Sequence, residues 1–199
     1  MRRSDPGKTA GMERHPLFRT PSLTVTPSGS GRGYRVEVTD SGGAPVATCD
    51  AAGAVRDTAG REVLAAPLRW DGRGEKPTDA ALDVRAADGR PLGTGRVVKY
   101  GLGPRSRKAT VALTDGGGGE AARLEPRDKR GEQLVLTAGG SEVASIDVAV
   151  VKRGFLRKGR VYTVALAEEI PAEMRPLALA VAIRYDALLN AVAAAAARD

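Results

Sequence analysis

The chain has 199 residues, of which 42% are hydrophobic, enough for one domain with a sizeable core and too many for an intrinsically disordered chain. Its single cysteine, Cys49, excludes an intramolecular disulfide, and its single histidine, His15, excludes a three-histidine metal site. The formal net charge of +7 permits anionic partners such as lipid head groups, nucleic acid or acidic proteins, although a solvated basic surface explains it equally well.

The N-terminal residues 1–20 combine Arg, Ser, Pro, Gly and Lys without periodicity, which predicts a flexible basic arm. Leu17 and Phe18 are the arm residues that can dock against a domain. No apolar stretch follows the initial Met-Arg-Arg, so we expect no signal peptide. Together with the lone cysteine, which we expect as a small buried side chain on a strand, this favours a cytoplasmic protein.

Residues 21–199 contain short segments of alternating polar and apolar residues separated by turn signals, which predicts one mainly β domain. In Tyr34–Thr39, for example, Tyr34, Val36 and Val38 fall on one face, and Asp88-Gly89 is a strong hairpin signal. The segments are 23–26, 34–39, 45–49, 62–65, 68–70, 82–86, 91–100, 109–113, 120–124, 133–137, 142–151 and 160–166. This predicts an antiparallel meander of roughly twelve strands, which must close to avoid exposed edges.

The C-terminal segment, about residues 173–197, predicts one helix, because Ala and Leu dominate it and no Gly or Pro follows Pro176. No position from 177 to 183 is polar, so the helix should be surrounded by apolar protein. Arg184, Asp186 and Asn190 interrupt it before the roughly 20 apolar residues of a membrane span are reached, which favours a core helix. Arg184 and Asp186 lie either where the helix leaves the barrel, the simpler reading, or beside polar partners.

We therefore expect a closed antiparallel β-barrel of about 12 strands that encloses one hydrophobic C-terminal helix. Leu82–Arg96 and the ending 162–189, which includes Pro176-Leu-Ala-Leu-Ala-Val-Ala-Ile-Arg-Tyr-Asp-Ala-Leu-Leu, resemble the tubby C-terminal-like superfamily. In particular they resemble LURP-one-related and phospholipid scramblase-like proteins. The resemblance implies a barrel threaded by its helix and binding of membrane phospholipid or phosphoinositide.

Basic residues gather in two stretches. In the first, interpreted as a loop between two strands, cations flank an apolar tip, a composition typical of docking to an anionic membrane. Its candidate lipid- or anion-binding residues are Lys152, Arg153, Phe155, Leu156, Arg157, Lys158 and Arg160. The second, interpreted as a hairpin loop, contributes Arg96, Lys99, Arg105, Arg107 and Lys108. The alternative is that Phe155 and Leu156 pack inward while the cations are merely solvated.

The sequence gives little support for nucleic-acid binding, a phosphate loop or a metal site. The basic stretches lack the interleaved aromatic residues that stack on single-stranded nucleic acid, so we do not expect nucleic acid as a partner. The glycines 116–119 are interpreted as a turn rather than a phosphate loop, and Asp83, Asp88 and Asp115 as turn residues rather than metal ligands. We expect no enzyme activity, cofactor, metal or membrane span. The leading hypothesis is peripheral binding of anionic phospholipid, and the alternative is a scaffold that binds an acidic protein.

Overall fold

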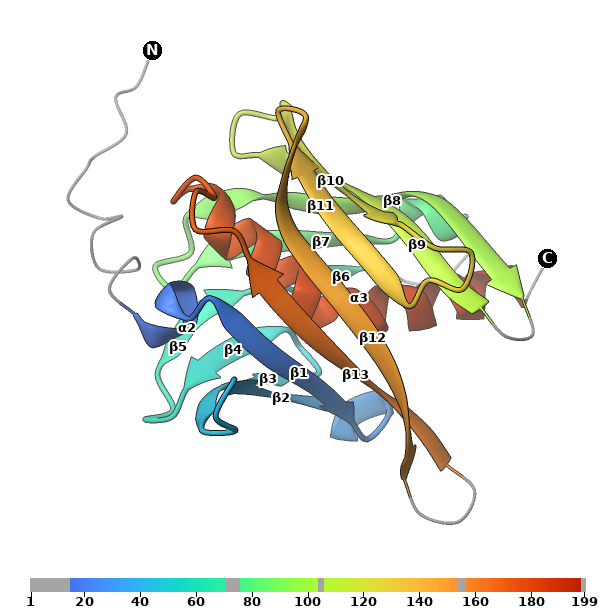
Figure 1. Cartoon of the computed structure of the whole chain (residues 1–199), viewed down its shortest axis with the longest axis horizontal. Coiled ribbons are helices and arrows are strands. Elements are labelled where there is room, and N and C mark those ends of the chain that lie inside the picture. The colour runs from blue at the N-terminus through green and yellow to red at the C-terminus, as the bar shows by residue number, and fades with distance from the viewer. Residues whose placement is uncertain (1–14, 71–75, 104–105, 154–156, 198–199) are drawn as a thin grey trace.

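Thirteen strands form one antiparallel sheet that curls around a C-terminal helix (Figure 1). The computed structural model describes residues 15–70, 76–103, 106–153 and 157–197. The strands are β1 (Ser22–Ser28), β2 (Arg35–Asp40), β3 (Pro45–Asp50), β4 (Ala54–Asp57), β5 (Glu62–Ala65), β6 (Leu68–Arg69), β7 (Ala81–Ala86), β8 (Pro91–Gly103), β9 (Ser106–Asp115), β10 (Glu120–Pro126), β11 (Gln133–Ala138), β12 (Ser141–Arg153) and β13 (Arg157–Leu166). Two 3₁₀ turns, η1 (Gly31–Gly33) and η2 (Pro77–Asp79), connect neighbouring strands.

The sheet closes because β7 pairs with β5 and β6 on the edge that faces away from β8. Leu64 lies opposite Ala86 and Leu68 opposite Leu82, so β5 and β6 together act as one strand interrupted at Ala66–Pro67. Proline cannot donate to a strand ladder, which explains the interruption. Counted in this way, twelve strands close the barrel, and the predicted fold class is confirmed.

The helix α3 (Met174–Ala196) fills the barrel. The six residues Leu177, Leu179, Val181, Ile183, Leu188 and Leu189 are each at most 1% exposed. By length and composition α3 is apolar enough to cross a membrane, but 72% of its most apolar window is buried inside the barrel. Burial of those six side chains contributes on the order of 10 kcal/mol as an upper figure. The barrel and its helix are therefore one folding unit.

Two contacts fix the position of α3 against the wall of the barrel. A Cβ built on Gly95 of β8 would lie 2.7 Å from Val181 Cγ2, so the helix approaches this strand as closely as a glycine allows. On β9, the Tyr185 hydroxyl donates to the Ala109 carbonyl and accepts from the Ala109 N–H, both at 2.9 Å. A helix side chain thereby supplies both hydrogen bonds for one strand residue.

The folded domain begins earlier than the sequence predicts. Residues Pro16–Arg19 form a short helix, α2, that buries Leu17 and Phe18. His15 caps it by accepting from the Leu17 N–H through Nδ1, and Arg175 at the start of α3 donates to the Phe18 carbonyl at 2.8 Å. Residues 15–20 thus belong to the domain and not to an arm, and Leu17 and Phe18 dock as expected. Residues 1–14 lie outside the described part.

Aspartates organise several of the turns between strands. Asp40, Asp88 and Asp115 each accept hydrogen bonds from backbone N–H groups two or more residues ahead, as predicted for Asp88 and Asp115. Asp83 is different, because it lies within β7 and faces Arg69, with 3.7 Å between Oδ1 and Nη2. Its assignment to a turn was wrong, since the residues after it continue the ladder with β8.

Candidate functional site

The two basic stretches form the far ends of two long hairpins, β8–β9 and β12–β13. The ladder of β12 with β13 extends to the pair Arg153 and Arg157, and that of β8 with β9 to Gly103 and Ser106. Within the predicted loop from Lys152 to Arg160, all the described residues, 152–153 and 157–160, are therefore strand and not loop. Of the predicted residues, Arg105, Phe155 and Leu156 lie outside the described part, and Arg107, Arg153, Arg157 and Lys158 are placed as strand positions.

Both hairpins point to the same end of the barrel. From β8 to β13 each strand is antiparallel to the next, so the end of β8, the β10–β11 turn and the end of β12 lie together, beside the C-terminal end of α3. We call this the basic end; its described exposed lysines and arginines include Lys99, Lys129, Arg130 and Lys152. At about 4.8 Å per strand, β9 and β12 are roughly 14 Å apart. The two basic stretches thus belong to the same end, where the β12–β13 hairpin projects beyond Asp147, the last β12 residue in the ladder with β11 (Figure 1).

The β10–β11 turn supplies cations that the sequence analysis missed. Lys129 and Arg130 are exposed, and the Lys108 ammonium donates to the Lys129 carbonyl at 3.2 Å, which joins the β8–β9 hairpin to this turn. Asp128 folds the turn by accepting from the Gln133, Arg130 and Glu132 N–H groups, and the Gln133 bond contributes most to lowering the pKa of its carboxyl. In the sequence, the charged run 127–130 was the feature that could have revealed these cations. Only the strand order shows that the run lies between the two hairpins.

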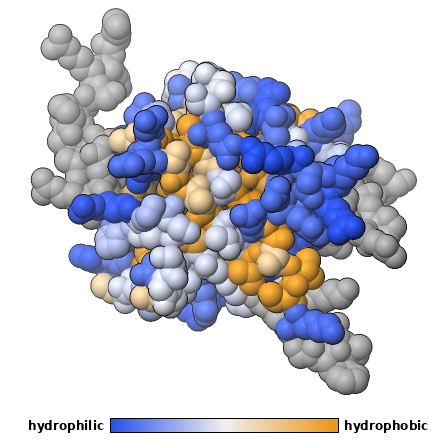
Figure 2. All heavy atoms as spheres, viewed as in Figure 1, coloured by the Kyte–Doolittle hydropathy of each residue, from blue (hydrophilic) through white to orange (hydrophobic). Residues whose placement is uncertain are grey.

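Exposed apolar side chains lie on the same two hairpins. Among the described residues the exposed large hydrophobics are Val98 (44%), Tyr100 (38%) and Val150 (58%). A bulge between Val97 and Lys99 leaves Val97 buried and turns Val98 outward. On β12 the run 148–151 is wholly apolar and at least partly exposed, because the hairpin extends past the barrel wall. Figure 2 shows a compact apolar patch bordered by hydrophilic residues near this hairpin.

A small hollow opens beside the β8–β9 hairpin. Its volume is about 250 Å³, and Lys99, Lys108, Thr110 and Glu125 are among its lining residues. Two ammonium groups in a hollow of this size suit a single phosphate or sulfate group rather than a whole lipid. Glu125 limits the net positive charge there to one.

Two of the predicted binding residues are engaged in the fold instead. Arg96 Nε donates to the Thr78 carbonyl at 3.2 Å, and its Nη2 lies 3.6 Å from Asp79. Arg160 Nη1 lies 3.6 Å from Asp186 on α3. Each of the two arginines therefore has a carboxylate close by, which partly offsets its charge, and their role in anion binding stays a prediction. Lys99 and Lys152, by contrast, are exposed and form no ion pair within the described part of the chain.

Asp186 connects the root of the β12–β13 hairpin to the helix. Its Oδ1 accepts from the Tyr162 hydroxyl at 2.9 Å and its Oδ2 from the Asn190 amide at 3.0 Å. Burial, and then the negative charge of Asp186, raises the pKa of Tyr162 well above its ordinary value. The projecting hairpin is thus held to the core at its base.

Arg184 is 2% exposed and does not mark the place where the helix leaves the barrel. Its guanidinium donates to the Asp50 and Ala51 carbonyls at 3.2 and 3.3 Å and lies 5.6 Å from the centre of the Tyr34 ring. Arg184 and Asp186 each have polar partners, so the second of the two sequence readings is correct. Cys49 is buried on β3 as expected, and burial raises the pKa of its thiol to about 11.

Within the described residues, no group of three or more His, Cys, Asp or Glu side chains is placed to hold a metal ion. The chain matches no protein-family model, no curated protein and no solved structure. The main functional feature of the described structure is the basic end, which combines exposed cations with exposed apolar side chains.

Proposed function

We propose that the protein binds anionic phospholipid membranes peripherally through its basic end. The observation that carries the proposal is that Val98, Tyr100 and Val150 lie on the same two hairpins as the exposed lysines. Apolar groups that enter the head-group boundary beside cations that contact phosphates are the composition of interfacial binding. A groove for single-stranded nucleic acid would instead call for several aromatic stacking residues, whereas Tyr100 is the only aromatic among the exposed large hydrophobic residues of the described part.

The expected affinity is modest and sensitive to salt. Each Lys or Arg near an anionic surface contributes about 1 kcal/mol, and this attraction decays within a Debye length. Lys99, Lys129, Arg130 and Lys152 alone therefore supply on the order of 4 kcal/mol, close to millimolar binding, before any apolar contribution. The hollow beside Lys99 and Lys108 offers a place for one head-group phosphate.

We also propose membership of the tubby C-terminal-like superfamily, as the sequence resemblance implies. A closed meander that encloses its C-terminal helix supports this proposal. The phospholipid or phosphoinositide binding implied by the resemblance agrees with the chemistry of the basic end, but the two arguments are independent. The lipid-binding proposal depends on the exposed side chains and does not require the family assignment.

Co-sedimentation with vesicles tests the proposal. The protein is mixed with phosphatidylcholine vesicles or with vesicles that also contain phosphatidylserine, at low and at high salt. The test variant is Lys99→Glu/Lys152→Glu, which reverses one charge on each hairpin. The matched control, Arg19→Glu/Arg85→Glu, changes net charge equally with two exposed arginines at the opposite end of the barrel.

We expect the wild type to pellet with anionic vesicles only, and less at high salt. The hairpin variant should lose at least tenfold in partition coefficient, because two favourable contacts become repulsive. The control should stay within about threefold. An equal decrease of the partition coefficient in both variants would show that binding depends only on net charge and not on the basic end. No pelleting with any vesicle would reject membrane binding and favour the alternative of an acidic protein partner.

A further inference from the structure

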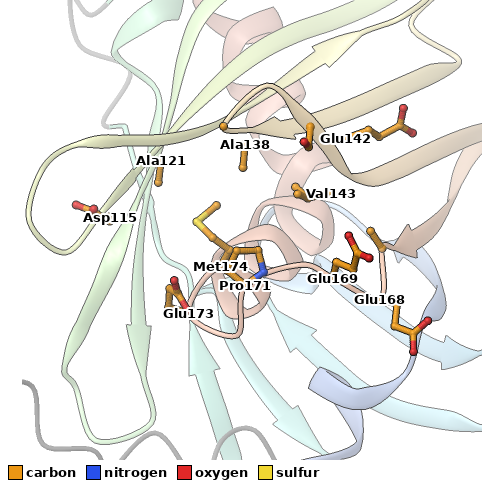
Figure 3. A pocket seen from close by; sticks show the side chains of 13 residues that line it. Asp115, Ala121, Ala138, Glu142, Val143, Glu168, Glu169, Pro171, Glu173 and Met174 are labelled. Atoms are coloured by element: carbon orange, nitrogen blue, oxygen red, sulfur yellow. The ribbon is translucent and has the colours of Figure 1, made fainter.

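A pocket of about 670 Å³ opens at the end of the barrel opposite the basic end. It lies where the β9–β10 turn, the β11–β12 turn and the segment between β13 and α3 come together (Figure 3). This volume falls in the range of sites that bind ligands or anchor side chains. Neither basic stretch contributes to its lining, so the proposed membrane-binding function does not account for it.

The floor of this pocket is apolar. Met174 and Val143 form its buried part, and Ala121 and Ala138 extend it toward the opening. Figure 3 shows these four side chains arranged around one central space. An apolar, half-open floor binds an apolar group because covering it removes hydrocarbon surface from water.

The rim of the pocket is acidic. Five carboxylates line it: Asp115, Glu142, Glu168, Glu169 and Glu173. The Asp115 carboxylate accepts hydrogen bonds from the Gly117 and Gly119 N–H groups, and the Glu142 carboxylate accepts one from Arg127. Glu168, Glu169 and Glu173 have no ion pair within the described part of the chain. Arg175, which donates to the Ala167 and Glu168 carbonyls, adds one positive charge beside the rim, and the positive end of the α3 dipole adds about half a charge. The three carboxylates exceed this sum, so the rim stays negative.

The carboxylates are spread around the opening instead of converging. Glu169 and Glu173 lie on opposite sides of Pro171 (Figure 3), and none of the described acidic residues forms a metal-binding group. This arrangement does not suit one compact cation. It suits several cations spaced along an extended ligand that also presents an apolar group to the floor.

We propose that this acidic pocket binds a lysine- and arginine-containing peptide segment of a partner protein, with an aliphatic side chain of that segment on the Met174 floor. Charge complementarity selects the class of partner, since a basic peptide is repelled by the basic end and attracted here. The pocket faces away from the basic end, so both ends can be occupied together. The protein would then link a basic partner to another surface.

Fluorescence anisotropy with a labelled Lys-Leu-Lys-Arg-Leu-Lys peptide tests the proposal in the absence of lipid. A second peptide, with both leucines replaced by serine, measures the contribution of the floor. The pocket variant is Glu169→Gln/Glu173→Gln, and the matched control is Glu37→Gln/Glu132→Gln, which removes two exposed carboxylates elsewhere. Thermal melting confirms that both variants are folded.

We expect the pocket variant to bind the leucine peptide roughly fivefold to tenfold more weakly than the wild type, and the control to bind within about twofold. The serine peptide should bind more weakly than the leucine peptide. Equal weakening of pocket and control variants would overturn the proposal, as would equal affinity for the two peptides. Complete displacement of the leucine peptide by an equal concentration of a linear tetra-amine would assign the pocket to a free polyamine instead. Because lipid is absent, failure here does not affect the membrane proposal.

Discussion

The Tyr162 hydroxyl donates a 2.9 Å hydrogen bond to the Asp186 carboxylate and thereby ties the β12–β13 hairpin to the central helix. Arg160 and Asn190 contact the same carboxylate. Asp186→Ala should therefore lower the free energy of unfolding by about 2 kcal/mol, because a charged hydrogen bond and its partners are lost together. Urea denaturation of Asp186→Ala, Tyr162→Phe and the double variant measures the coupling between the two residues. Additive effects would show that the bond contributes nothing measurable.

The enclosure of the helix makes a sharper prediction. Ile183 is fully buried, so Ile183→Asp forces an unpaired charge into the barrel and should leave the protein unfolded or insoluble. Ala194→Asp is the matched control, since Ala194 is exposed on the same helix, and its stability should change by less than about 1 kcal/mol. Circular dichroism of the soluble fraction reports the result. A folded Ile183→Asp protein would mean that the helix is not enclosed in solution.

Close packing between Gly95 and Val181 predicts a compensating pair of substitutions. Gly95→Ala places a Cβ 2.7 Å from Val181 Cγ2 and should destabilise the protein by roughly 1–3 kcal/mol. Val181→Ala removes the opposing methyl groups and is destabilising by itself because it leaves a cavity. The double variant should be more stable than the sum of the single effects predicts, by at least about 0.5 kcal/mol. Strict additivity in chemical denaturation would contradict the close approach.

Buried tyrosines predict a loss of stability at alkaline pH. Burial raises the pKa of Tyr185 to about 12, and also raises the pKa of Tyr34 and Tyr162. A phenol that holds its proton more tightly in the folded state contributes constant stability below its unfolded pKa of 10. That contribution is lost as pH rises from 10 through the folded values. Phenolate absorbance should therefore increase together with unfolding.

Tyr34→Phe offers a clean check of this pH dependence. The Tyr34 hydroxyl is buried and has no hydrogen-bond partner within the described residues, so its removal should not reduce stability at neutral pH. Above about pH 10 the variant should lose stability less steeply, because it releases one phenol proton fewer on unfolding than the wild type does. Urea midpoints across this pH range test both statements. An unchanged slope would show that Tyr34 titrates alike in the two states.

The apolar side chains of the hairpins predict a salt-insensitive part of membrane binding. Val98→Ser/Val150→Ser should weaken binding to anionic vesicles by a similar factor at low and high salt, because it removes hydrocarbon contact and not charge. Both residues are exposed, so thermal stability should hardly change. Vesicle titration at two salt concentrations measures this. A loss confined to low salt would indicate a purely electrostatic surface.

The sequence was sufficient for the main architecture. The unbroken apolar run from Leu177 to Ile183 required a helix covered on all sides, and alternating segments with aspartate and glycine turns required a meander around it. Local patterns carry this information, because burial on every face leaves no place for polar residues. A short strand such as β4 has too few alternating residues to be recognised, and it was missed.

Tertiary structure decided what the charged residues do. Arg96 and Arg160 look like free cations in the sequence, yet each lies beside a carboxylate distant in the chain, Asp79 or Asp186. The grouping of Lys129 with Lys108, and of Met174 with five carboxylates, likewise depends on strand order and register. Turn chemistry and hydrophobic periodicity depend on residues close together in the chain, so turns, strands and helices can be predicted from the sequence. Ion pairs, rims and pockets join segments far apart, so only the closed barrel determines them.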